Sequence, residues 1–67
     1  MHLETDRIAV GIRFKINDLG AVRCPNLADK SGIVVAVSRR TTGVAVLFDG
    51  DRQPTYLHRD YITQASE

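Results

Sequence analysis

Two short β-branched runs joined by a polar loop constrain the fold of this chain more than any other feature. The first run is GIVVAVS, residues 32–38, and the second is VAVLF, residues 44–48. Gly43 lies between them, where a hairpin loop often needs a residue in the left-handed conformation. Both runs are short, rich in valine and bounded by turn residues. They therefore predict the two strands of an antiparallel hairpin, with Gly43 at positive φ and Gly50 likewise in the turn DGD that follows.

The rest of the chain also carries strand patterns, and no window shows a sustained helical apolar face. The segment IRFKI, residues 12–16, alternates apolar and charged residues. AVRC, residues 21–24, is expected to be a strand that ends at Pro25, which cannot donate to a ladder. After the hairpin we expect a strand at PTYL, a 3₁₀ turn at HRDY and a last strand at YIT. The sequence thus predicts an all-β fold of five or six short strands.

A chain of 67 residues is expected to form one domain. We expect an N-terminal extension at residues 1–11 that is partly disordered, followed by a barrel at residues 12–64. Strand alternation predicts a core of Val22, Ile33, Val35, Val37, Val44, Val46, Leu57 and Ile62. Both faces of the hairpin are apolar, so the second face needs cover, either from the N-terminal segment or from self-association.

The order of these elements resembles that of a small SH3-like barrel: a strand, a long loop, a central hairpin, a turn, a strand, a 3₁₀ turn and a last strand. The stretch AVRC…KSGIVVAV is similar to the KOW-type pattern, with Gly32 in the place of the glycine that precedes the strand leaving the first loop. The resemblance covers residues of about 20 to 63 and extends to small bacterial and phage-type barrels. It implies a five-stranded SH3-like barrel with a 3₁₀ turn before the last strand. It also implies RNA, or ribosomal and transcription proteins, as partners.

Several classes of function find no support in the sequence. The net charge is +1, which neither demands nor excludes nucleic acid. Cys24 is the only cysteine, and with His2 and His58 it shows no metal-ligand spacing. No nucleophile motif or phosphate loop is present. We therefore expect no enzyme activity, no cofactor and no metal. The apolar runs are far too short to cross a bilayer, so we expect a cytoplasmic protein without a membrane partner.

The candidate binding residues are cationic or aromatic side chains in the second half of the chain. Aromatic rings stack on bases, and arginine contacts phosphates or planar edges. These residues predict a non-enzymatic binding module with nucleic acid as its first partner class. The alternatives are a protein-interaction adaptor, in which the same residues grip a peptide, and a homo-oligomeric module. The candidate residues are Arg39, Arg40, Arg52, Tyr56, His58 and Arg59.

A purely structural interpretation of the same residues stands beside the functional one. Tyr61 can be a core residue with its hydroxyl at the rim. His58 can cap the 3₁₀ turn, and Arg59 can pair with Asp49, Asp51 or Asp60. Pairing of this kind would cancel the positive charge on which nucleic-acid binding depends.

Overall fold

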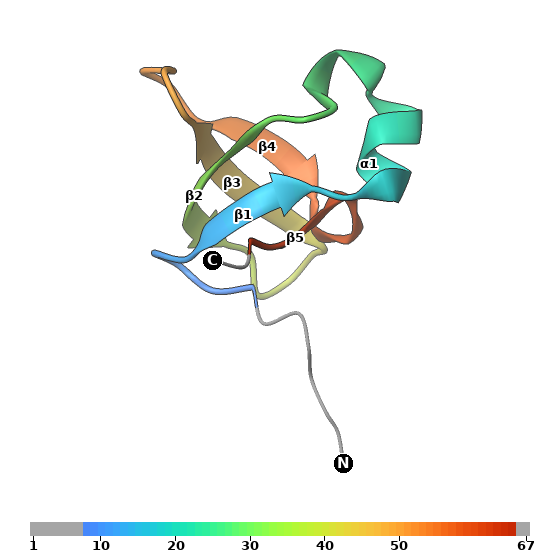
Figure 1. Ribbon diagram of the computed structural model, residues 1–67. Helices are drawn as coiled ribbons and strands as arrows, with labels where there is room; N and C mark the ends of the chain where they lie inside the picture. The colour runs from blue at the N-terminus through green and yellow to red at the C-terminus, as the bar shows by residue number, and fades with distance from the viewer. Residues whose placement is uncertain (1–7, 66–67) are drawn as a thin grey trace.

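The computed structural model describes residues 8–65, which fold into five antiparallel strands of one sheet, a short helix and two 3₁₀ turns (Figure 1). The expected extension at residues 1–11 falls mostly on residues 1–7, which lie outside this range. In chain order the elements are β1 (Arg13–Ile16), α1 (Asp18–Arg23), η1 (Pro25–Leu27), β2 (Ser31–Val37), β3 (Gly43–Phe48), β4 (Thr55–His58), η2 (Arg59–Tyr61) and β5 (Ile62–Gln64).

The sheet has the order β4-β3-β2-β1-β5, so the last two strands of the chain form its two edges. Within residues 8–65, no hydrogen-bonded ladder joins β4 to β5. The turn η2 covers the short distance between these edge strands along the chain. The prediction of an all-β fold is confirmed in part. The five strands are antiparallel, and the β2–β3 hairpin, the 3₁₀ turn and the final strand are present, but Asp18–Arg23 form a helix.

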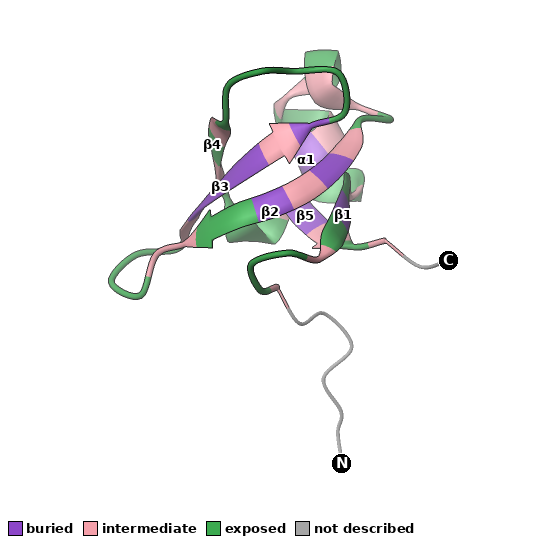
Figure 2. Cartoon of the chain, turned by 90° about the vertical axis from the view of Figure 1, so that its left-hand side faces the viewer, coloured by how far each residue is buried: buried purple, intermediate pink, exposed green. Residues whose placement is uncertain are grey.

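The core lies on the concave side of the curled sheet and centres on two phenylalanines. Phe14 of β1 and Phe48 of β3 are both paired in register with Gly32 of β2. Because Gly32 has no side chain, the two rings meet across it, with centroids 5.5 Å apart and planes inclined at 55°. Val34, Val44, Val46 and Ile62 complete the buried cluster, which is purple in Figure 2.

The prediction for the core was right for β3 and β5 but wrong for most of β2. Val44, Val46 and Ile62 are buried, and Leu57 packs against them. In β2, however, Gly32 faces the core, so alternation along the strand turns Val34 inward as well. Ile33 therefore lies outside the core cluster, and Val35 is 39% exposed. A one-residue change of phase moves a whole strand face in this way. A β-bulge between Val34 and Ala36 then returns Val37 to the core side.

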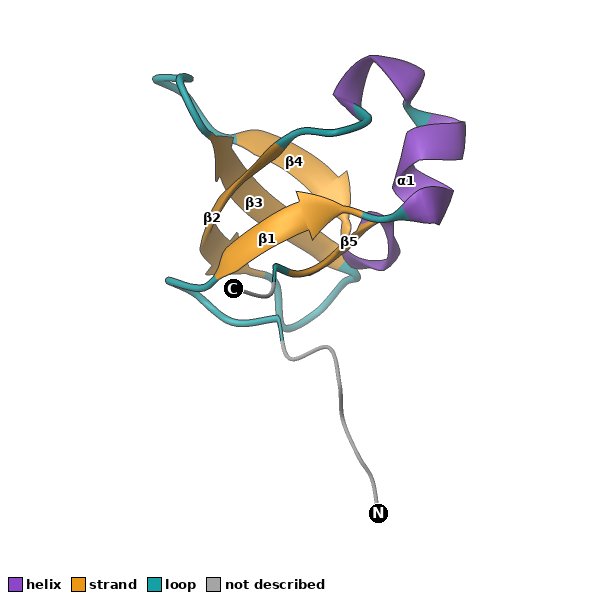
Figure 3. Cartoon of the chain, viewed as in Figure 1, coloured by secondary structure: helices purple, strands orange, loops and turns teal. Residues whose placement is uncertain are grey.

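The expected strand at AVRC is wrong, because this segment belongs to α1. Asn17 caps the helix by accepting a hydrogen bond from the Gly20 N–H at 2.8 Å. Six residues are too few for a helix to be stable alone. Here α1 packs closely on η2, since a Cβ at the buried Gly20 would collide with the carbonyl oxygen of Tyr61. Figure 3 shows α1 standing beside one end of the sheet. Val22 of this helix is 74% exposed, so its predicted place in the core is wrong.

The two hairpin glycines differ in conformation. Gly50 has φ of 91°, as the DGD turn predicts. Gly43 is the first residue of β3 and is not among the positive-φ glycines, so the prediction for it is wrong. Side-chain hydrogen bonds in the preceding loop make a left-handed residue unnecessary there.

Gly32→Ala tests the close approach at the centre of the sheet. A Cβ at Gly32 would collide with the carbonyl oxygen of Leu47 and meet Cα of Phe48 at 2.7 Å. We expect the substitution to lower the free energy of unfolding by about 1–3 kcal/mol, as overpacking does. Gly43→Ala is the control, because its Cβ would find its nearest neighbour at 3.4 Å. Urea denaturation measures both variants, and equal stabilities would contradict this account of the core.

Candidate functional site

The outer face of the sheet, opposite the core, carries small residues in two rows that end at Tyr56 and His58 on β4. Ala36, Ala45 and Tyr56 are paired in register across β2, β3 and β4. In the next row, Gly43 pairs with His58. Since the intervening Leu57 packs on the core, Tyr56 and His58 share the outer face, as strand alternation predicts.

A shallow groove of about 330 Å³ lies over these rows. Ala36, Gly43 and Ala45 line it with Val37 and Val44, and Tyr56 lines it from the edge strand. Tyr56 is 78% exposed, whereas Ala45, its partner in register on β3, is only 4% exposed. The volume lies at the lower end of the range for small-ligand sites, about 300–1,000 Å³. The groove offers an apolar lining and an accessible aromatic ring.

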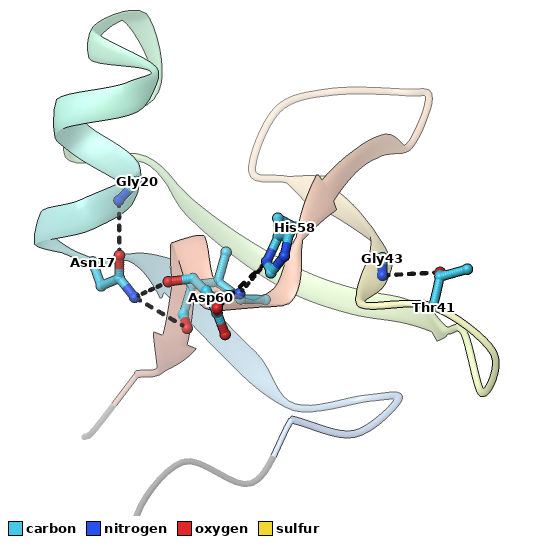
Figure 4. A network of polar contacts seen from close by, with 7 residues as sticks. Asn17, Gly20, Thr41, Gly43, His58 and Asp60 are labelled. Atoms are coloured by element: carbon cyan, nitrogen blue, oxygen red, sulfur yellow. Dashed lines mark hydrogen bonds and ion pairs between the residues drawn. The ribbon is translucent and has the colours of Figure 1, made fainter.

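The loop at residues 38–42, called the arginine loop below, borders the groove and carries Arg39 and Arg40. The Ser38 Oγ accepts hydrogen bonds from the backbone N–H groups of Arg40 and Thr41, at 3.2 and 3.1 Å. The Thr41 Oγ1 in turn accepts from the Gly43 N–H at 3.1 Å (Figure 4). These bonds hold the loop backbone from within. Arg39 and Arg40 remain exposed and form no ion pair with any other described residue.

His58 caps η2, which confirms one structural role considered for it. Its Nδ1 accepts a hydrogen bond from the Asp60 N–H at 3.0 Å, and its ring lies 5.5 Å from that of Tyr61. An accepting Nδ1 leaves the proton of a neutral imidazole on Nε2. The His58 side chain is 40% exposed, so it combines a structural bond at Nδ1 with a donor at Nε2.

Arg59 follows directly and is tied to the arginine loop through its backbone. Its N–H donates to the Thr42 carbonyl oxygen at 2.7 Å. Arg59 also lines a second hollow, of about 360 Å³, beside Asn17 and Leu19. Among residues 8–65 it makes no ion pair, so the pairing with Asp49, Asp51 or Asp60 that the sequence allowed is not present there.

Arg52 does not lie with the other candidate residues. It is in the turn between β3 and β4, next to the Val46–Thr55 end of their ladder, whereas His58 pairs with Gly43 at the other end. Figure 2 shows the exposed loops at residues 38–42 and 49–54 at opposite ends of β3. The structure therefore brings Arg39, Arg40, Tyr56, His58 and Arg59 to one end of the sheet and leaves Arg52 at the other.

Asp49, one of the possible acidic partners of Arg59, forms an ion pair with a different arginine at the far end of the sheet. The Arg13 guanidinium binds the Asp49 carboxylate with two contacts, at 2.7 and 3.3 Å. The hydrogen bond from Arg13, with smaller help from its charge and from Ser31, lowers the pKa of Asp49 below its ordinary value of 3.8. Asp49 is thereby engaged on the outer face away from the arginine loop.

The sequence interpretation missed the residues that shape the groove. Ala36 and Ala45 stand in strands that are otherwise rich in valine, and Gly43 opens β3. Small residues at paired positions are a signal for a depression in a sheet surface, but their pairing depends on the register. The bulge in β2 sets that register, and it brings Ala36 opposite Ala45.

Comparison of the chain with protein-family models, curated proteins and solved structures finds no match. The side chains of residues 8–65 include no group of three potential metal ligands. In the same residues, no helix is long and apolar enough to span a bilayer. The candidate site must therefore be judged on its own geometry.

Asp49→Asn tests the ion pair through its pH dependence. A folded-state pKa below the unfolded value means that the ionised carboxylate stabilises the fold above that unfolded value. The contribution is lost as the pH falls through the folded pKa. We expect Asp49→Asn to lower the melting temperature at neutral pH, and the difference from the parent protein to vanish in acid, below the lowered pKa.

Asp51→Asn is the matched control, because Asp51 is exposed in the same turn and makes no ion pair with another described residue. Thermal melts recorded from acid to neutral pH compare the two variants. The same pH profile for both would show that Arg13 contributes nothing through Asp49.

Proposed function

We propose that this chain is a non-enzymatic binding module whose partner is nucleic acid. The observation that carries the proposal is the combination, at one end of the sheet, of Arg39 and Arg40 with the exposed ring of Tyr56. Arginine contacts phosphate through a planar fork of donors, and an exposed aromatic ring offers a stacking surface. The residues that line the groove include no carboxylate.

The charge at this end supports an anionic partner. Arg39, Arg40 and Arg59 make no ion pairs among the described residues, so the fold leaves their charges uncompensated. Asp60 is the acidic residue of η2, and its carboxylate lies 3.8 Å from the His58 Nδ1. The loop at residues 38–42 and η2 thus carry three arginines and one aspartate, a charge balance that favours a phosphate backbone as partner.

His58 adds a donor to the same surface. With Nδ1 engaged by the Asp60 N–H, the neutral ring presents Nε2–H, which can donate to a phosphate or carbonyl oxygen. This role needs no charge on the imidazole. Ser38 and Thr41 are already hydrogen-bonded within the loop, which favours a binding role for the groove over a catalytic one.

We also assign the fold to the SH3-like barrels as part of this proposal. Four strands in meander, a 3₁₀ turn and a fifth strand that returns beside β1 support the assignment. The 3₁₀ turn between the two edge strands is the feature that the resemblance leads us to expect. The resemblance of the sequence to the KOW-type pattern, in which Gly32 and β2 are retained although AVRC belongs to α1, favours RNA as one form of the nucleic acid.

A second candidate, a protein partner or a second copy of the chain, is favoured by a different part of the outer face. Ile33 and Leu47 are paired side by side outside the core cluster, and Val35 nearby is 39% exposed. Apolar surface of this kind can mark a protein interface. Sedimentation separates this candidate from the first, since a clean monomer at high concentration removes self-association.

The salt dependence of binding tests the nucleic-acid proposal. We expect a fluorescein-labelled oligonucleotide to bind at low salt and to lose roughly tenfold in affinity between about 50 and 200 mM salt, as expected for two or three phosphate contacts. Replacing Arg39 and Arg40 together with alanine should reduce the slope of log affinity against log salt by about 1.4–1.8. Fluorescence anisotropy measures both quantities.

Arg52→Ala is the control, because Arg52 is also exposed and without an ion pair among the described residues, but lies at the other end of the hairpin. Its salt slope should match that of the parent protein. No binding of single-stranded or duplex oligonucleotide at low salt would refute the proposed function. An equal loss in both variants would refute its location at the arginine loop.

A further inference from the structure

The groove beside Tyr56 has a shape that suits one planar group better than an extended surface. Its lining includes the small residues Ala36, Gly43 and Ala45 together with Val37 and Val44. Ser38 and Thr41 stand on the loop side, and Tyr56 stands on the β4 side. The space between these walls is about 330 Å³. A double helix cannot enter it, whereas a single ring system can lie against this lining.

Tyr56 differs from the tyrosine and phenylalanines described above, because its ring does not pack in the hydrophobic core. Phe14 and Phe48 are buried against one another, and Tyr61 packs partly on the core and against His58. Tyr56 is 78% exposed at the sheet edge. An exposed ring beside an apolar lining can be covered by a base, which gains both stacking and apolar burial.

We propose that the groove holds a single unpaired base, so that the protein selects single-stranded over duplex nucleic acid. This inference rests on the proposed function and adds the class of nucleic acid. In a duplex, each base is stacked between its neighbours and offers no ring face to a protein side chain. An unpaired base can leave the strand, lie against Tyr56 and keep its phosphate near Arg39 and Arg40.

The polar groups of the groove do not suit the recognition of one particular base. The Ser38 Oγ accepts from two backbone N–H groups and from the Thr41 hydroxyl. Thr41 donates to Ser38 and accepts from the Gly43 N–H, so its hydroxyl is engaged in both directions. Stacking is tolerant of base identity because every base has a π-face. The groove therefore selects unpaired bases with little preference among them.

The test compares three labelled oligonucleotides of equal length at one salt concentration: oligothymidine, the same length of abasic strand, and a duplex. We expect oligothymidine to bind tightest and the abasic strand, which keeps the phosphates, to bind about 5- to 100-fold more weakly. Tyr56→Ala should lower the affinity for oligothymidine by a similar factor, and the affinities for the abasic strand and the duplex by much less. Tyr56→Phe should retain binding, because stacking needs the ring and not the hydroxyl.

Ala36→Leu provides a second variant that keeps Tyr56. Ala36 is exposed on the outer face, so a larger side chain fills the groove without entering the core. It should weaken oligothymidine binding as Tyr56→Ala does. Thermal melts establish that both variants are folded.

The outcomes separate the inference from the proposed function. Equal binding of all three probes, unaffected by either groove variant, would overturn the single-base inference while the phosphate-binding function stands. Absence of binding to any probe at low salt would overturn both. A third outcome is that an acidic, tryptophan-containing peptide displaces oligothymidine, binds more tightly than it and loses affinity in Tyr56→Ala. This outcome would overturn both the single-base inference and the nucleic-acid function, in favour of a protein partner.

Discussion

The carboxamide of Asn17 is the contact on which the arrangement of the other elements most depends. Its Oδ1 accepts from the Gly20 N–H at 2.8 Å and starts α1, while its Nδ2 donates to the Asp60 carbonyl oxygen at 2.7 Å (Figure 4). The Asn17 backbone N–H also donates to the Tyr61 carbonyl oxygen at 3.0 Å. An amide side chain supplies a donor and an acceptor together, which neither aspartate nor serine does in the same geometry. Since η2 connects the two edge strands, Asn17 fixes how the open sheet curls.

The candidate site follows from this curl through a short series of contacts. Asn17 holds η2, and η2 is capped by His58 at the end of β4. The Arg59 N–H then holds the Thr42 carbonyl, which draws the arginine loop against the same end of the sheet. The groove between loop and edge strand is hollow because the residues in register there are alanine and glycine. Hydrogen bonds to backbone groups, two of them made by side chains, thus assemble the site, and its arginines make no ion pair among the described residues.

The sequence was sufficient to predict features that depend on local pattern, and insufficient for those that depend on register. The hairpin, the 3₁₀ turn and the outward direction of Tyr56 follow from residue type and alternation. The helix α1 was missed because six residues carry little periodicity, and its stability comes from Asn17 and from the contact of Gly20 with Tyr61. The core face of β2 was missed because both faces are apolar, and the choice depends on Gly32 making room for two phenylalanine rings. Arg52 and the arginine loop are close in sequence, but β3 separates them in space.

The proposed function requires nucleic acid to bind where the arginine loop, Tyr56 and η2 meet. Its most direct test is an NMR titration of the isotope-labelled protein with oligothymidine at low salt, following the backbone amides. We expect the shifting amides to cluster at residues 38–45 and 56–59, while those of α1 and of the turn around Arg52 stay in place. Shifts centred on α1 or on the Arg52 turn, or a spectrum that does not change, would contradict it.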